Sequence, residues 1–235
     1  MEILNPKNKE QDLVDDVARM QLSRRLFLRS AGLFTAGAAL ASCGRDDSGL
    51  SLPGSQGINL GSGDTGVLNY AYALEQLEAA FYTRVISSPY TGMTATETAY
   101  LQDIRDHEIA HREFFKNVLG NNAIPALEVD FSGINFGSRD SVLATARAFE
   151  DLGVSAYNGA GRLLTSATNL LVAGKIVSVE ARHAALIRDL ITPNSFAGSD
   201  VIDANGLDLV RTPTQVLAIA RPFLKSQLDA SNLPS

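Results

Sequence analysis

Apolar residues recur at alternating spacings of three and four along four segments of this chain, which is the period of an amphipathic helix. A fifth, shorter segment opens with Pro213, which favours a first helical turn, and stops at Pro222, which breaks a helix. The pattern predicts an all-α fold with four long helices and one short C-terminal helix. These helices are expected at residues 64–87, 95–119, 140–167, 169–191 and 213–221.

The connections between the four long segments differ in length. Short links near residues 88–93 and 166–169 each join two helices into a hairpin, whereas residues 120–139 form a long connection between the hairpins. A four-helix bundle with one crossover between its second and third helices has this connectivity. The sequence therefore predicts such a bundle over residues 64–192.

The ends of the bundle are less sharply defined. Asp64 or Thr65 is expected to cap the first helix, because both residue types favour that position. Residues 193–235 form a C-terminal extension that carries the short last helix. Its polar first part, residues 193–212, either packs over the bundle or moves as a cover, and the sequence leaves both readings open.

The helical stripes form an internal repeat that carries the candidate chemistry. The first and third segments share a stripe with one glutamate at a matching position, and the second and fourth share a stripe containing Glu-x-x-His. Residues three apart lie on nearly the same helical face, and buried carboxylates need a partner. Four carboxylates and two imidazoles form the ligand set of a carboxylate-bridged dinuclear site, which suits iron or manganese. The candidate metal ligands are Glu75, Glu108, His111, Glu150, Glu180 and His183.

Three side chains beside these positions have open roles. Glu78 lies one turn beyond Glu75, and its counterpart in the repeat is Gly153. It is an additional or alternative ligand, an acceptor near the ligands, or a solvent-facing residue. Tyr82 and Tyr157, two turns beyond the glutamates, are interpreted as core residues with hydrogen-bonded hydroxyl groups rather than as redox participants.

His107 offers a different interpretation of the second helix. Together with Glu108 and His111 it forms the pattern HExxH, in which both histidines bind zinc and the glutamate is the base of a protease. That scheme leaves the second Glu-x-x-His without a role, so the dinuclear site is preferred. His107 is then expected near the ligands or on the surface, with direct contact to the metal as a less favoured alternative.

The N-terminal residues carry targeting signals. Residues 23–29 hold a twin-arginine motif, the apolar run 30–41 follows it, and Cys43 stands where a bacterial lipoprotein is lipidated. We expect residues 1–42 to be a signal peptide with a lipobox and residues 43–63 to be a flexible tether. The protein would be exported to the periplasm or envelope and attached to a membrane through a lipid anchor.

The charge balance narrows the range of partners. The chain has 26 Asp and Glu against 20 Lys and Arg, with a net charge of −6. No basic surface for nucleic acid is expected from this composition. Cys43 is the only cysteine, so no intramolecular disulfide can form.

Four stretches, residues 68–82, 104–111, 148–157 and 178–190, together resemble the ferritin-like proteins. Within them, the chain is similar to the group that includes desiccation-related proteins and many exported bacterial members. The resemblance implies a bundle with a di-iron or di-manganese centre, in which Glu75 and Glu150 are terminal ligands and Glu108 and Glu180 bridge. Better-known members oxidise ferrous iron, reduce dioxygen or peroxide, or dismutate peroxide.

The leading expectation is an exported, protective metalloprotein that acts with two iron or manganese ions on peroxide, or on dioxygen and ferrous iron. The alternative is a non-enzymatic envelope stress or desiccation-related protein in which the metal is structural or absent. The oligomeric state is left open by the sequence, with a homodimer among the options.

Overall fold

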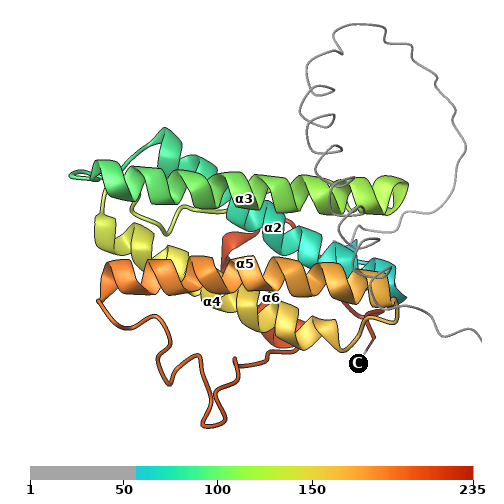
Figure 1. Ribbon diagram of the computed structural model, residues 1–235. Helices are drawn as coiled ribbons and strands as arrows, with labels where there is room; N and C mark the ends of the chain where they lie inside the picture. The colour runs from blue at the N-terminus through green and yellow to red at the C-terminus, as the bar shows by residue number, and fades with distance from the viewer. Residues whose placement is uncertain (1–56, 235) are drawn as a thin grey trace, which may run out of the picture. The chain divides into compact units, whose positions relative to one another are not determined.

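The computed structural model describes residues 57–234, and they form a four-helix bundle with a short fifth helix (Figure 1). Helices α2 and α3 pack as one hairpin, and α4 and α5 as the other. The predicted all-α fold and the long crossover between α3 and α4 are confirmed. The helices are α2 (Gly63–Ser87), α3 (Ala95–Leu119), α4 (Arg139–Gly161), α5 (Ala167–Ile191) and α6 (Pro213–Ala220); the 3-10 turns are η1 (Gly120–Asn122) and η2 (Arg221–Phe223); the strands are β1 (Ile58–Asn59) and β2 (Leu228–Asp229).

Local sequence determines where most helices begin. Thr94 and Glu97 form a reciprocal capping box at the start of α3, and Thr212 and Gln215 form another at the start of α6. The hydroxyl of Ser138 accepts from the Ser141 amide at the start of α4. These contacts satisfy amide groups that a first helical turn leaves without partners.

The start of α2 corrects the predicted cap. Ser62 occupies the cap position without a side-chain bond, and Asp64 lies within the first turn. The Asp64 carboxylate instead accepts hydrogen bonds from Thr165 and Ser166, in the loop between α4 and α5, and from the Asn169 side chain in the first turn of α5. The predicted end of α4 near residue 167 was wrong, because α4 ends at Gly161 and residues 162–166 connect it to α5.

Residues 57–62 are part of the folded domain. Ile58 donates its amide to Gln227 and Leu60 donates to Asp229, so β1 pairs with β2 in parallel, and the Leu60 side chain is fully buried. The predicted flexible tether was therefore wrong for these residues. Its other part, together with the predicted signal peptide and Cys43, lies outside the described residues.

The first part of the C-terminal extension packs on α4 and α5. The Arg211 amide donates to the Ser155 carbonyl, and the buried Arg188 guanidinium holds both Asp151 and Asp200. Gly159 permits this approach, because a Cβ there would lie 1.8 Å from the carbonyl oxygen of Arg211. Of the two readings of residues 193–212, the structure shows the packed one.

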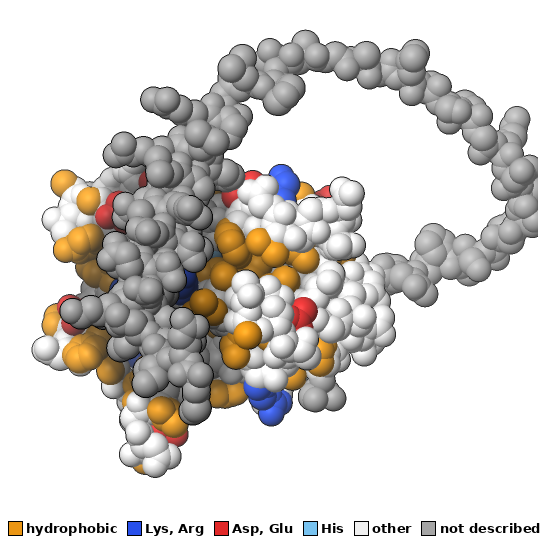
Figure 2. All heavy atoms as spheres, turned by 45° about the vertical axis from the view of Figure 1, so that its right-hand side comes forward, with side chains coloured by type: hydrophobic (Ala, Val, Ile, Leu, Met, Phe, Trp, Pro, Cys, Tyr) orange, Lys and Arg blue, Asp and Glu red, His pale blue; other side chains and the backbone are white. Residues whose placement is uncertain are grey.

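Some large apolar side chains stay exposed on the bundle, among them Phe114 and Val118 of α3 and Leu170 and Leu171 of α5. Figure 2, which brings forward the side where α5 begins, shows hydrophobic side chains gathered there. Within the described range, none of the helices combines the length and apolar character that crossing a membrane requires. The homodimer stays a prediction.

Candidate metal centre

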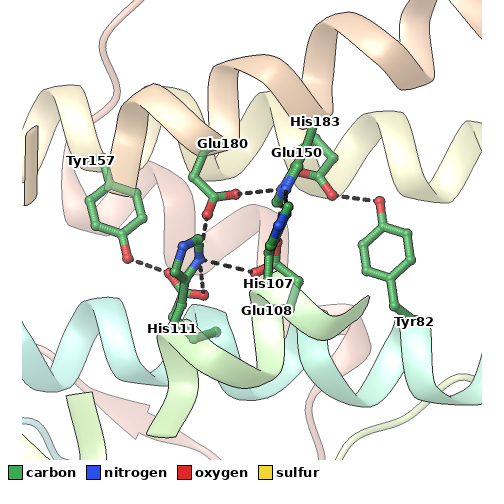
Figure 3. A network of polar contacts seen from close by, with 9 residues as sticks. Tyr82, His107, Glu108, His111, Glu150, Tyr157, Glu180 and His183 are labelled. Atoms are coloured by element: carbon green, nitrogen blue, oxygen red, sulfur yellow. Dashed lines mark hydrogen bonds and ion pairs between the residues drawn. The ribbon is translucent and has the colours of Figure 1, made fainter. Parts of the chain in front are cut away.

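The six predicted ligands meet in the middle of the bundle, although they come from four different helices (Figure 3). The four glutamates are fully buried, His183 is 4% exposed, and the His111 side chain is 13% exposed. Each points inward because it lies on the apolar stripe of its helix. They form two groups: Glu75, Glu108, His111 and Glu180; and Glu108, Glu150, Glu180 and His183.

Two glutamates are shared by both groups. In one, His111 Nδ1 lies 2.9 Å from Glu180 Oε1 and 3.8 Å from Glu108 Oε2. In the other, His183 Nδ1 lies 2.9 Å from Glu108 Oε1 and 3.7 Å from Glu180 Oε2. Each shared carboxylate therefore turns one oxygen toward each histidine.

Each group also has a carboxylate of its own. Glu75 Oε2 lies 3.4 Å from His111 Nδ1, and Glu150 Oε2 lies 3.4 Å from His183 Nδ1. The distances in the two groups match closely, so the sequence repeat is reproduced as a local twofold arrangement of side chains.

The donor atoms fit metal ions. Eight buried oxygen and nitrogen atoms of these six residues have no hydrogen-bond partner, although several of them lie within ion-pair distance of one another. Two donors bound at a right angle to one ion, each about 2.1 Å away, lie about 3 Å apart. Buried polar atoms that converge without bonding to each other leave their lone pairs for a cation between them.

Comparison with known protein families matches residues 63–193 to the ferritin-like domain. The chain belongs to the ferritin-like domain family. The matched region begins with α2 and ends just beyond α5, so it includes all six converging residues. A search of curated proteins finds no match.

The electrostatics of this ferritin-like site are dominated by burial and by crowded carboxylates. Burial, together with repulsion from Glu180 and Glu75, raises the pKa of Glu108 well above its usual range. Burial alone would lower the pKa of His111, but the nearby carboxylates outweigh it and raise that pKa to about 12. The pKa of His183 is raised in the same way. The surrounding carboxylates, and not burial, therefore decide the direction of the pKa shift of both imidazoles.

A tyrosine from the opposite hairpin supports each unshared glutamate of the ferritin-like bundle. The Tyr82 hydroxyl donates to Glu150 Oε1 at 2.5 Å, and the Tyr157 hydroxyl donates to Glu75 Oε1. Burial raises the pKa of both phenols, so both remain donors. Each tyrosine thus fixes one oxygen of its partner and leaves the other oxygen turned toward the histidine.

His107 lies outside both groups. Its Nδ1 is 2.9 Å from Nε2 of His183, and the two ring planes lie within 8° of each other, so the rings meet edge to edge. The zinc-protease interpretation would need His107 and His111 on one ion. In the described residues Glu108 instead belongs to both groups and His107 to neither, which argues against that arrangement.

Glu78 is also outside both groups, but it is buried beside them, with 3% of its surface exposed. Burial, followed by repulsion from Glu108 and Glu180, raises its pKa well above the usual range. Of the three roles that the sequence left open, the solvent-facing one does not fit this burial.

Proposed function

We propose that this ferritin-like protein binds two iron or manganese ions and uses them in oxidation and reduction with peroxide, or with dioxygen and ferrous iron, in a protective role. The observation that carries the proposal is the convergence of eight buried, unpartnered donor atoms in two groups that share two carboxylates. Two divalent ions would balance the charge of four ionised glutamates.

In this proposal the side chains have distinct tasks. Glu108 and Glu180 would be shared by the two ions, Glu75 and Glu150 would each hold one ion, and His111 and His183 would complete the two positions. When bound, the ions would pass electrons to peroxide or dioxygen and would take electrons from ferrous iron or from a second peroxide. Tyr82 and Tyr157 orient the terminal carboxylates through their hydrogen bonds.

We further propose that the protein acts outside the cytoplasm. The twin-arginine motif and Cys43 support export and lipid attachment to an envelope membrane. The twin-arginine route carries folded proteins, so the metals would be loaded before export. Cell fractionation of a Cys43→Ser variant tests this: loss of the protein from the membrane fraction is expected, and unchanged membrane association would contradict lipid attachment.

The test of the metal proposal is reconstitution of the purified protein with ferrous iron or with manganese, followed by metal quantification and assays of peroxide loss and ferrous oxidation. We expect two ions per chain and turnover in at least one assay. Glu108→Gln should abolish both, whereas Glu113→Gln, on the same helix but outside the site, should change neither.

Two results would count against this proposal in different ways. Two bound ions without turnover in either assay would support a structural metal in a non-enzymatic stress protein. Failure to bind metal in stoichiometric amounts after reconstitution would refute the dinuclear site itself.

A further inference from the structure

Glu78 is a buried carboxylate for which the six-residue site gives no role. It lies one helical turn beyond Glu75 on α2, it is 3% exposed, and the charged groups that act on it are other carboxylates, Glu108 and Glu180 foremost. A buried carboxylate without a partner is costly to a fold. Its retention beside a cluster of metal-binding residues therefore calls for a role in the site.

The position of Glu78 along α2 directs it to the middle of the site. Tyr82 contacts Glu150, and Glu75 contacts Tyr157, so these two hydrogen bonds align α2 with α4. Glu78 lies between the two bonded positions on α2. Its carboxylate is close enough to be acted on by the charges of all four candidate glutamates, which belong to both groups.

Gly153 supplies the space that the Glu78 carboxylate fills. It lies in the interior of α4, where a glycine weakens a helix relative to alanine. A Cβ at this position would lie 3.2 Å from Glu78 Oε1 and 3.7 Å from Glu180 Oε2. Because Glu180 is one of the two shared carboxylates, the space at Gly153 joins Glu78 to the centre.

We propose that Glu78 is a fifth carboxylate of the metal centre, accommodated by Gly153, and that its charge favours the more oxidised state of the bound ions. This inference rests on the proposed dinuclear function. Four carboxylates balance two divalent ions, with a total charge of +4. Transfer of one electron from the ions to peroxide or dioxygen raises that total to +5, which the fifth carboxylate balances inside a site where water does not screen the charge.

The experiment is a potentiometric titration of the iron-loaded protein and of its Glu78→Gln variant. The amide keeps the size of the side chain but removes its charge, so the reduction potential should shift upward while two ions still bind. Glu97→Gln is the matched control: it removes another buried carboxylate, eleven residues along α3 from Glu108, and should leave the potential nearly unchanged.

Gly153→Ala provides a second variant that keeps every charge of the site. Its added methyl group should displace the Glu78 carboxylate and shift the potential in the same direction by less. Unchanged potentials in both Glu78→Gln and Gly153→Ala would overturn the role of Glu78 but not the proposed function. A wild-type protein that binds no iron or manganese would overturn both.

Discussion

The two hairpins of the bundle are alike where they carry the predicted ligands and different at the neighbouring positions. Each supplies one glutamate from its first helix, one Glu-x-x-His from its second and one supporting tyrosine. At two positions the repeat fails: Glu78 of the first hairpin corresponds to Gly153, and His107 corresponds to Val179.

The repeated and the unrepeated residues have different consequences for the site. The repeated residues create two similar positions for a cation, whereas the unrepeated ones give those positions unlike surroundings. Of the two histidines in the groups, only His183 contacts another imidazole. Its Nε2, the ring nitrogen that does not face the carboxylates, lies next to His107. In the proposed function, the symmetry of the hairpins would provide the capacity to hold metal, and the unrepeated residues would make the two positions differ.

The largest expected effect comes from removing a carboxylate that belongs to both groups of donor atoms. Glu108→Ala removes oxygens from both groups, so binding of both ions should fall by more than about 100-fold, whereas Glu150→Ala should weaken one position and leave one ion bound. Metal quantification after gel filtration distinguishes the two variants. Retention of two ions by Glu108→Ala would show that the two metal positions do not share this carboxylate.

A second prediction concerns the surface that only the second hairpin offers to the C-terminal extension. Gly159→Ala places a methyl group against the Arg211 carbonyl, so we expect a loss of about 2–3 kcal/mol in the free energy of unfolding. Chemical denaturation measures it. Gly174→Ala in α5, where a Cβ meets nothing within 4 Å, is the control and should be neutral or stabilising.

His107, which has no counterpart in the second hairpin, should affect metal binding at only one of the two positions. His107 Nδ1 faces Nε2 of His183, and such outer contacts hold a ligand imidazole with its other nitrogen toward the metal. We expect His107→Ala to weaken one of two binding steps by about 10-fold in a calorimetric manganese titration. Val179→Ala, at the matching position, should leave both steps unchanged; equal weakening of both steps in His107→Ala would contradict the asymmetry.

The smallest effect is expected where the first hairpin supports the loop of the second. Hydrogen bonds from the Thr165 amide and hydroxyl lower the pKa of Asp64 in the folded protein. The ionised carboxylate therefore stabilises the fold fully above about pH 4, the usual pKa of an aspartate, and this stabilisation is lost as the pH falls towards the lowered pKa. Asp64→Asn should cost about 1 kcal/mol at pH 7.

Thermal unfolding of the wild type and of Asp64→Asn between pH 2 and 7 tests this contribution. The difference between them should shrink as the pH falls. A difference that stays constant over this range would show that the charge of Asp64 is not what stabilises the loop.

The parts of the molecule that could be predicted are those that repeat. The four helices and the convergence of Glu75, Glu150 and the two Glu-x-x-His pairs follow from periodic stripes, because a helix turns each stripe into one face. Comparison of the stripes also identified Glu78 and Gly153 as a mismatch. It could not show that the mismatch leaves a buried carboxylate against a glycine.

The features that were missed depend on single contacts between distant segments. Asp64 reaches Thr165 about 100 residues along the chain, and two strands of two residues each have no period to detect. His107 meets His183 only because α3 and α5 come together at the site. The sequence contained these residues, but their partners were determined by tertiary packing.

The parallel pairing of β1 with β2 has a mechanical consequence. A pull applied to the chain at residue 57 is carried first by the backbone bonds from Ile58 to Gln227 and from Leu60 to Asp229, and by the burial of Leu60. Because β1 lies between residue 57 and the start of α2, its contacts with β2 share the load before it reaches the helix. Tension on the N-terminal side would therefore be borne by two short strands, while the helix that carries Glu75 stays wound.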